Sequence, residues 1–182
     1  MSKSISWIAL PVAALLFAAC ASVPQGREER QALVAEANRT LEMMMQRDPS
    51  LRDLLDQAYG YVVFPRVGEV SAVAVGGLSG AGVVFEQGQP IGFARIREAS
   101  FGPQLGGQYF SQLVILENRE AMDRLRSGNF DLTAGLQATA LDYGAGAQTQ
   151  FENGVAVIVD SERGLIAGAT VGGQQIDFEP MA

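Results

Sequence analysis

The chain has 182 residues, 48% of them hydrophobic, with 21 glycines, one cysteine and no histidine. This size and apolar content suit one modest domain with a real core and exclude a disordered chain, while the missing histidine excludes a serine–histidine or cysteine–histidine catalytic pair and the commonest metal ligand. With 13 basic against 20 acidic residues the chain is a poor match for nucleic acid, whose binding rests on neutralising phosphates, so we predict no nucleic-acid partner. We also predict no catalytic residue, no metal and no cofactor.

The first predicted element is a signal peptide over residues 1–19. Its apolar stretch, ISWIALPVAALLFAA, follows Lys3 and the free amino group, and it is shorter than the roughly 20 apolar residues of a transmembrane helix. The ending LFAAC resembles the lipobox of bacterial lipoproteins, in which the cysteine is acylated with chains such as palmitate. A chance cysteine after an ordinary signal peptide is the alternative. We favour the lipobox because the chain's single cysteine lies at the one position that needs it.

The lipobox resemblance implies lipid attachment at Cys20, a short tether over residues 20–26, and membrane anchoring through the acyl chains. Alanine at position 21 favours the outer membrane, and we expect the domain to face the periplasm. Cleavage would remove Lys3 and leave 12 arginines against 20 acids, a net charge of −8. Such an acidic body does not suit an anionic membrane surface in general, so a lipid contact of the domain must be local.

Two helices are predicted next. Residues 27–47 carry an apolar stripe at helical spacing, formed by Leu33, Val34, Ala37, Leu41, Met44 and Met45. We interpret two of the three consecutive methionines 43–45 as core residues rather than as a binding surface. A second helix is predicted over DPSLRDLLDQA, with Asp48 as the N-cap and Pro49 at the first helical position.

Strands dominate after residue 60. YGYVVFP is predicted as a buried strand that Pro65 ends, and EVSAVAVGG and AGVVFEQ as further strands. IGFARIRE alternates, which predicts Ile91 and Phe93 on one face together with Arg95 and Arg97.

The two arginines of that strand have two interpretations. Arg95 and Arg97 on one strand face could form an anion site. The commoner alternative is a solvated face with ion pairs to Glu98 or Glu86, which we favour.

A short inserted helix is predicted at about 118–127. Its spacing places Ala121, Met122 and Leu125 inward, pairs Glu120 with Arg124, and leaves Gly128 as the C-terminal stop. Most of the remaining chain is predicted as strands. The expected fold class is α+β: a mostly antiparallel, glycine-rich sheet or partial barrel with N-terminal helices and this one insertion.

Four segments resemble the SYLF domain family, a lipid-binding family of bacterial envelope proteins and eukaryotic actin-associated proteins. They are AYGYVVFP (58–65), VGGLSGAGVVF (75–85), SFGPQLGGQYFSQLVILENREAMDRLRSG (100–128) and SERGLIAGATVGG (161–173). The resemblance implies a single SYLF-like domain over residues 27–182 that binds lipid, with phospholipid as the expected ligand class.

The resemblance also suggests which residues contact lipid. In eukaryotic members a basic N-terminal segment contacts phosphoinositides, and the corresponding helix here carries Arg27, Arg30 and Arg39. With Arg95 and Arg97 these are the candidate lipid-binding residues, while Cys20 is the candidate attachment site. We do not carry actin binding over to a secreted bacterial lipoprotein.

Two function hypotheses follow. The first is a non-catalytic, membrane-anchored envelope lipoprotein whose domain binds lipid. The second is a structural or assembly protein of the envelope that acts through protein–protein contacts.

Overall fold

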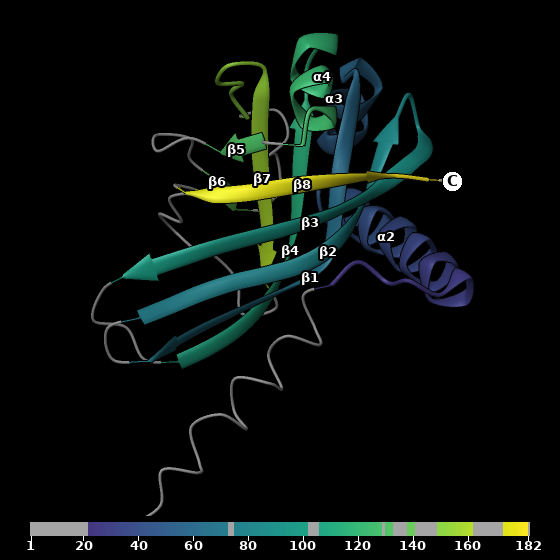
Figure 1. Cartoon of the computed structure of the whole chain (residues 1–182). Coiled ribbons are helices and arrows are strands. Elements are labelled where there is room, and N and C mark those ends of the chain that lie inside the picture. The colour runs from purple at the N-terminus through teal and green to yellow at the C-terminus, as the bar shows by residue number, and fades with distance from the viewer. Residues whose placement is uncertain are drawn as a thin grey trace, which may run out of the picture.

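The computed structural model describes residues 22–72, 75–101, 106–128, 130–132, 138–140, 149–161 and 173–181. In these ranges three helices accompany one eight-stranded sheet (Figure 1). The helices are α2 (Arg27–Arg47), α3 (Ser50–Gln57) and α4 (Arg119–Arg126). The strands are β1 (Gly60–Ala72), β2 (Val75–Glu86), β3 (Gln89–Phe101), β4 (Gly106–Leu116), β5 (Phe130–Leu132), β6 (Ala138–Ala140), β7 (Val155–Ser161) and β8 (Gln174–Pro180).

The strands follow the order β5-β8-β3-β2-β1-β4-β7-β6. Among the described strands six pairings are antiparallel, and β6 with β7 is parallel. Three strands separate β4 from β8 in this order, yet the side-chain Nε2 of Gln112 on β4 donates to Oε1 of Gln174 on β8 at 3.0 Å. The sheet must therefore curl strongly, so the predicted α+β class with a mostly antiparallel, partly closed sheet is confirmed.

The curl gives the sheet a concave and a convex face, each with its own hydrophobic core. Because strand side chains alternate, Val62 and Val114 join the concave core while Val63 and Leu113 join the convex one. Residues of α4 complete the concave core, and the buried stripe of α2 covers the convex core. No helix within the described residues is long and apolar enough to cross a membrane.

Helix α2 has the predicted limits of 27 and 47. Its stripe is buried as expected at Leu33, Ala37, Leu41 and Met44. Met43 is 58% exposed while Met45 packs against the convex core, which confirms that two of the three methionines are core residues.

Helix α3 begins at Ser50 with Pro49 at its N-cap position, so the prediction of Asp48 as the N-cap and Pro49 as the first helical residue is wrong by one residue. The Asp48 carboxylate accepts a hydrogen bond from the backbone N–H of Ser50 at 3.0 Å and another from its hydroxyl at 2.7 Å. These bonds satisfy a donor of the first turn, which is what an N-capping side chain does.

The predicted strand end at Pro65 is wrong. Strand β1 continues to Ala72, and the register shifts between Val63 and Arg66 against β2 and between Phe64 and Val67 against β4. This bulge accommodates a proline because the bulged residue needs no ladder N–H. EVSAVAVGG is likewise divided between β1 and β2, with residues 73–74 outside the described ranges.

Gly82 on β2 leaves space for the bulged segment of β1. A Cβ at this position would lie 2.6 Å from the carbonyl oxygen of Val63 and 2.6 Å from the Phe64 ring. The glycine-spaced sequence of β2 therefore has a packing cause.

Two further predictions need correction. Ile91 packs against the concave core, whereas Phe93 lies in the convex core, because the β2–β3 register shifts between Val84 and Phe85. On α4, the ion pair four residues apart joins Arg119 to Asp123 at 3.6 Å instead of Glu120 to Arg124.

Other predictions for this helix are confirmed. Ala121, Met122 and Leu125 are buried, and Gly128 follows the helix with a φ of +85°. Positive φ is the backbone conformation that favours glycine after a helix.

Candidate functional site

A groove of about 670 Å³ lies between the start of α2, the start of β3 and the residue after β8. Three separate segments of the sequence meet there because α2 covers the convex face near the β3–β8 pair. We call this site the cationic groove, and its lining residues are Gln25, Arg27, Arg30, Gln31, Val34, Pro90, Phe93 and Met181. No described residue that lines it carries a carboxylate.

Arg30 holds the groove together. Its guanidinium lies 5.0 Å from the centroid of the Phe93 ring and forms an ion pair with Glu179. Its Nε also donates to the carbonyl oxygen of Pro24 at 2.8 Å. A cation over an aromatic face, with its donors satisfied, fixes the position of helix, strand and N-terminal segment together. Arg30 thus has a structural role, and its charge is largely compensated.

Arg27 is different. It is exposed in the first turn of α2, and it has no ion-pair partner among the described residues. A guanidinium can bind a phosphate or carboxylate through two parallel hydrogen bonds. Arg27 is therefore the group of this groove that is available to an anion.

The opposite wall of the groove is apolar. Phe93 is 1% exposed and forms its floor, while Met181 is 38% exposed at its rim. The backbone N–H of Met181 donates to the carbonyl oxygen of Ile91 at 3.0 Å, which holds the C-terminal segment against β3. Because Phe93 is nearly covered, the accessible apolar surface is mainly that of Met181, and an alkyl chain against it would gain roughly 0.8 kcal/mol per buried methylene.

The cationic groove contains two of the five predicted lipid-binding arginines. Arg39 lies farther along α2, exposed and outside the lining, with its Nε donating to the Ala35 carbonyl at 3.3 Å. Arg97 pairs with Asp177 at 2.7 Å, so this strand face does carry an ion pair, although the partner is neither Glu98 nor Glu86. Arg95 is half-buried, and its Nε has no hydrogen-bond partner among the described residues. Cys20 lies outside the described residues.

The segment before α2 is packed against the domain. Val23 is 3% exposed and belongs to the convex core, and the side chain of Gln25 donates to the Val23 carbonyl at 3.1 Å. The described part of the predicted tether therefore lies along the protein surface and reaches the rim of the cationic groove at Gln25.

Sequence reasoning missed the apolar half of this groove. Phe93 was expected only as a strand residue of the core, and nothing in the sequence associated Pro90 or Met181 with a site. Their role depends on the pairing of β3 with β8, which brings residues near 92 next to residues near 180.

Among the described residues, no three His, Cys, Asp or Glu side chains gather where they could hold a metal ion. The chemistry that the cationic groove offers is binding: one available guanidinium, amide groups and an apolar wall.

Comparisons with known proteins agree with the sequence motifs. Residues 97–181 match the family model Ysc84, described as "Las17-binding protein actin regulator". Over 151 residues the chain is 24% identical to "Beta cell expansion factor A" from Aeromonas veronii, which covers 82% of this chain. The chain spans about 57% of the length of that relative. The match over residues 97–181 is to the Ysc84 (SYLF) domain, the same family that the sequence motifs resemble.

Proposed function

We propose that this protein is a membrane-anchored lipoprotein of the bacterial envelope whose non-catalytic domain binds lipid in the cationic groove. The observation that carries the proposal is the Arg27 guanidinium, which has no ion-pair partner in the described part of the chain, beside the apolar wall of Phe93 and Met181. A lipid phosphate suits the first and an acyl chain suits the second. The family match over residues 97–181 supports it, because the SYLF resemblance implies lipid binding.

Lipid attachment at Cys20 would place the anchor beside this groove. Cys20 precedes Val23 by three residues, and three residues span at most about 10 Å. Val23 is fixed in the convex core. Gln25, which lines the groove, follows Cys20 by five residues. The proposal therefore has the acylated protein on the outer membrane, facing the periplasm, with its cationic groove near the lipid headgroups.

The test uses the chain from residue 21 onward, which lacks both Cys20 and the apolar segment 5–19, so that any membrane contact comes from the domain. We expect it to sediment with vesicles that contain phosphatidylglycerol more than with vesicles of phosphatidylcholine alone. Adding Arg27→Gln should weaken this binding about tenfold, the value of one charge-assisted contact. Arg39→Gln is the matched control, because Arg39 lies on the same helix, is equally exposed and is outside the groove.

Two outcomes would contradict the proposal. Equal losses for Arg27→Gln and Arg39→Gln would mean that the domain responds to general charge and not to the groove. If Cys20→Ser still fractionated with the outer membrane of cells while the chain from residue 21 onward failed to bind vesicles, lipid attachment would not be the main tether.

A specific surface favours the alternative, an assembly role in the envelope. Strands β1–β4 extend beyond the helices (Figure 1), and Tyr109 on their convex face is 62% exposed, with the Arg66 guanidinium 4.3 Å from its ring. Val70, 39% exposed, lies on the same face of the neighbouring strand. Exposed aromatic and arginine side chains are enriched in protein interfaces. Cross-linking in envelopes, compared with Tyr109→Ser, would test this role through the loss of a specific adduct.

A further inference from the structure

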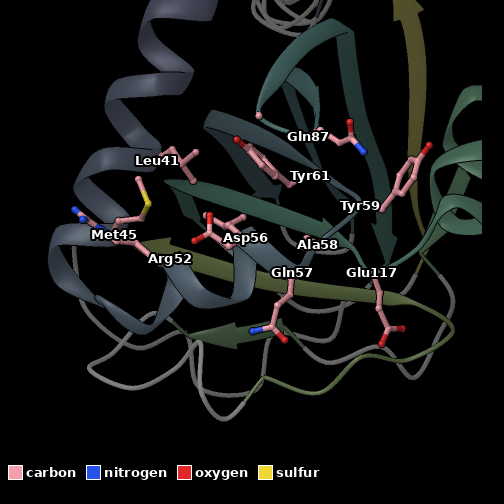
Figure 2. A pocket seen from close by; sticks show the side chains of 12 residues that line it. Leu41, Met45, Arg52, Asp56, Gln57, Ala58, Tyr59, Tyr61, Gln87 and Glu117 are labelled. Atoms are coloured by element: carbon pink, nitrogen blue, oxygen red, sulfur yellow. The ribbon is translucent and has the colours of Figure 1, made fainter.

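A second groove, of about 770 Å³, lies at the other end of α2 (Figure 2). It is formed by the last turns of α2, helix α3, the start of β1 and the turn between β2 and β3. We call it the acidic groove, and its lining residues are Leu41, Met45, Arg52, Leu55, Asp56, Gln57, Ala58, Tyr59, Tyr61, Gln87, Gly88 and Glu117. The proposed lipid function makes no use of it.

One side of the acidic groove is apolar and rigid. Leu41 and Met45 come from α2 and Leu55 from α3, and all three pack in or against the convex core. The Tyr61 ring stacks on Phe85 with centroids 5.1 Å apart and an interplanar angle of 20°. This stack fixes the phenol group in the groove, where Figure 2 shows it between the helices and the β2–β3 turn.

Two carboxylates line the same groove without ion-pair partners among the described residues: Asp56 and Glu117. Figure 2 shows Asp56 beside Tyr61, and burial together with the negative charge of Asp56 raises the pKa of the Tyr61 phenol. Tyr61 is therefore neutral in the physiological range and can accept a hydrogen bond through its oxygen. The one guanidinium of the lining, Arg52, is turned towards Met45 and away from Asp56 in Figure 2.

We propose that the acidic groove binds a primary ammonium group that carries an apolar body. The ammonium N–H groups would donate to the Asp56 carboxylate and to the Tyr61 oxygen. The apolar body would lie along Leu41, Met45 and Leu55. An anion is disfavoured because carboxylates outnumber guanidinium groups in the lining, and a charged donor to a carboxylate is among the stronger hydrogen bonds.

Hexylammonium is the simplest probe, and calorimetric titration of the full chain measures its binding. We expect hexylammonium to bind more tightly than hexanol, which lacks the charge, and than hexyltrimethylammonium, which lacks N–H donors. Asp56→Asn should weaken hexylammonium binding about tenfold or more. Asp53→Asn is the matched control, since Asp53 is an exposed aspartate of the same helix outside the groove.

Tyr61→Phe adds a second readout, because it keeps the ring stack and removes only the oxygen. It should weaken hexylammonium and leave hexyltrimethylammonium unchanged. Equal binding of hexylammonium by Asp56→Asn and Asp53→Asn, or equal binding of hexylammonium and hexanol, would overturn the proposal.

A further experiment distinguishes a lipid headgroup from a soluble amine as the source of the ammonium group. Vesicles of phosphatidylethanolamine and of phosphatidylcholine differ in N–H donors, so a preference for the former that Asp56→Asn abolishes would assign the group to a lipid headgroup. Binding of hexylammonium without such a preference would assign it to a soluble amine. Either result is independent of Arg27, so failure here is distinguishable from failure of the cationic groove.

Discussion

The cationic and acidic grooves lie against the same helix but are built in opposite ways. In the first, the sheet and the C-terminal segment supply apolar residues and α2 supplies the cations. In the second, α2 and α3 supply the apolar residues, and α3 and the segment after β4 supply the carboxylates. The difference shows that α2 has one strip for the core and two ends whose chemistry depends on the neighbouring segment.

The largest effect should come from a change that removes both grooves at once. Gly82→Val places a side chain where even a Cβ would be 2.6 Å from the Val63 carbonyl oxygen. Because backbone cannot move away cheaply, we expect a loss of about 3 kcal/mol or more in the free energy of unfolding. Thermal unfolding followed by circular dichroism measures it, and binding at both grooves should fall together.

Gly88→Ala is the control for this change. Gly88 has a φ of +77° with open space around its Cβ position, and it lies at the rim of the acidic groove. We expect a loss of only about 1 kcal/mol from backbone strain. A Gly82→Val protein as stable as Gly88→Ala would contradict the packing argument.

A smaller effect is expected from a substitution that leaves both grooves intact, Gln112→Leu. Gln112 is fully buried on the concave face, and its Nε2 bonds to Gln174, which is 3% exposed. Gln112→Leu removes the donor to the Gln174 Oε1, but it also removes the Gln112 Oε1, which has no hydrogen-bond partner in the ranges that the structure describes. We expect a net loss of about 1–2 kcal/mol, measured by denaturant unfolding, with unchanged binding at the convex face.

A double-mutant cycle with Gln174→Leu isolates the bond. The loss in the double variant should be smaller than the sum of the two single losses, because the second change removes a partner that the first has already orphaned. Strictly additive losses would show that this bond does not connect β4 to β8.

The smallest effect concerns the acidic groove alone. Asp56→Asn removes a negative charge that raises the pKa of Tyr61, so the pKa should fall towards its ordinary value, though burial still raises it. Ultraviolet titration of phenolate formation, with Tyr61→Phe to assign the signal, measures the shift. An unchanged Tyr61 pKa would show that the Asp56 charge does not act on the Tyr61 phenol.

The same residue sets a pH limit on stability. The folded-state pKa of Tyr61 lies above its unfolded value, so its contribution is fully present below the unfolded pKa of about 10. It is lost as pH rises through the folded pKa, because the unfolded chain releases the proton first. Asp56→Asn should make this alkaline loss smaller.

Local patterns were enough to predict the helices. The stripe of residues 33–45 fixes both the extent of α2 and the exposure of Met43, and Asn118 followed by Ala121, Met122 and Leu125 defines α4. The strand irregularities were not predictable in this way. A proline usually ends a strand, which is why β1 was expected to stop at Pro65, and simple alternation placed Ile91 on the same face as Phe93. Both expectations are wrong because of bulges, and these bulges depend on pairing with neighbouring strands.

The candidate sites divide along the same line. Arg27 and Arg30 could be named because the SYLF resemblance points to the basic residues of this N-terminal helix. Their apolar partners could not, since Phe93 and Met181 lie more than 60 residues along the chain from Arg27 and Arg30 and are brought there by the β3–β8 pairing. The sequence contains no motif for the acidic groove, because the lining residues come from five places along the chain.

The burial of Val23 has a consequence for binding strength. Under the proposed acylation of Cys20, the domain could explore only a shell about 10 Å deep around its anchor. Within such a shell the effective concentration of headgroups at the groove is very high, as it is for the second contact of any linked pair. A groove with weak affinity in solution would then be occupied most of the time, and would still release its ligand quickly.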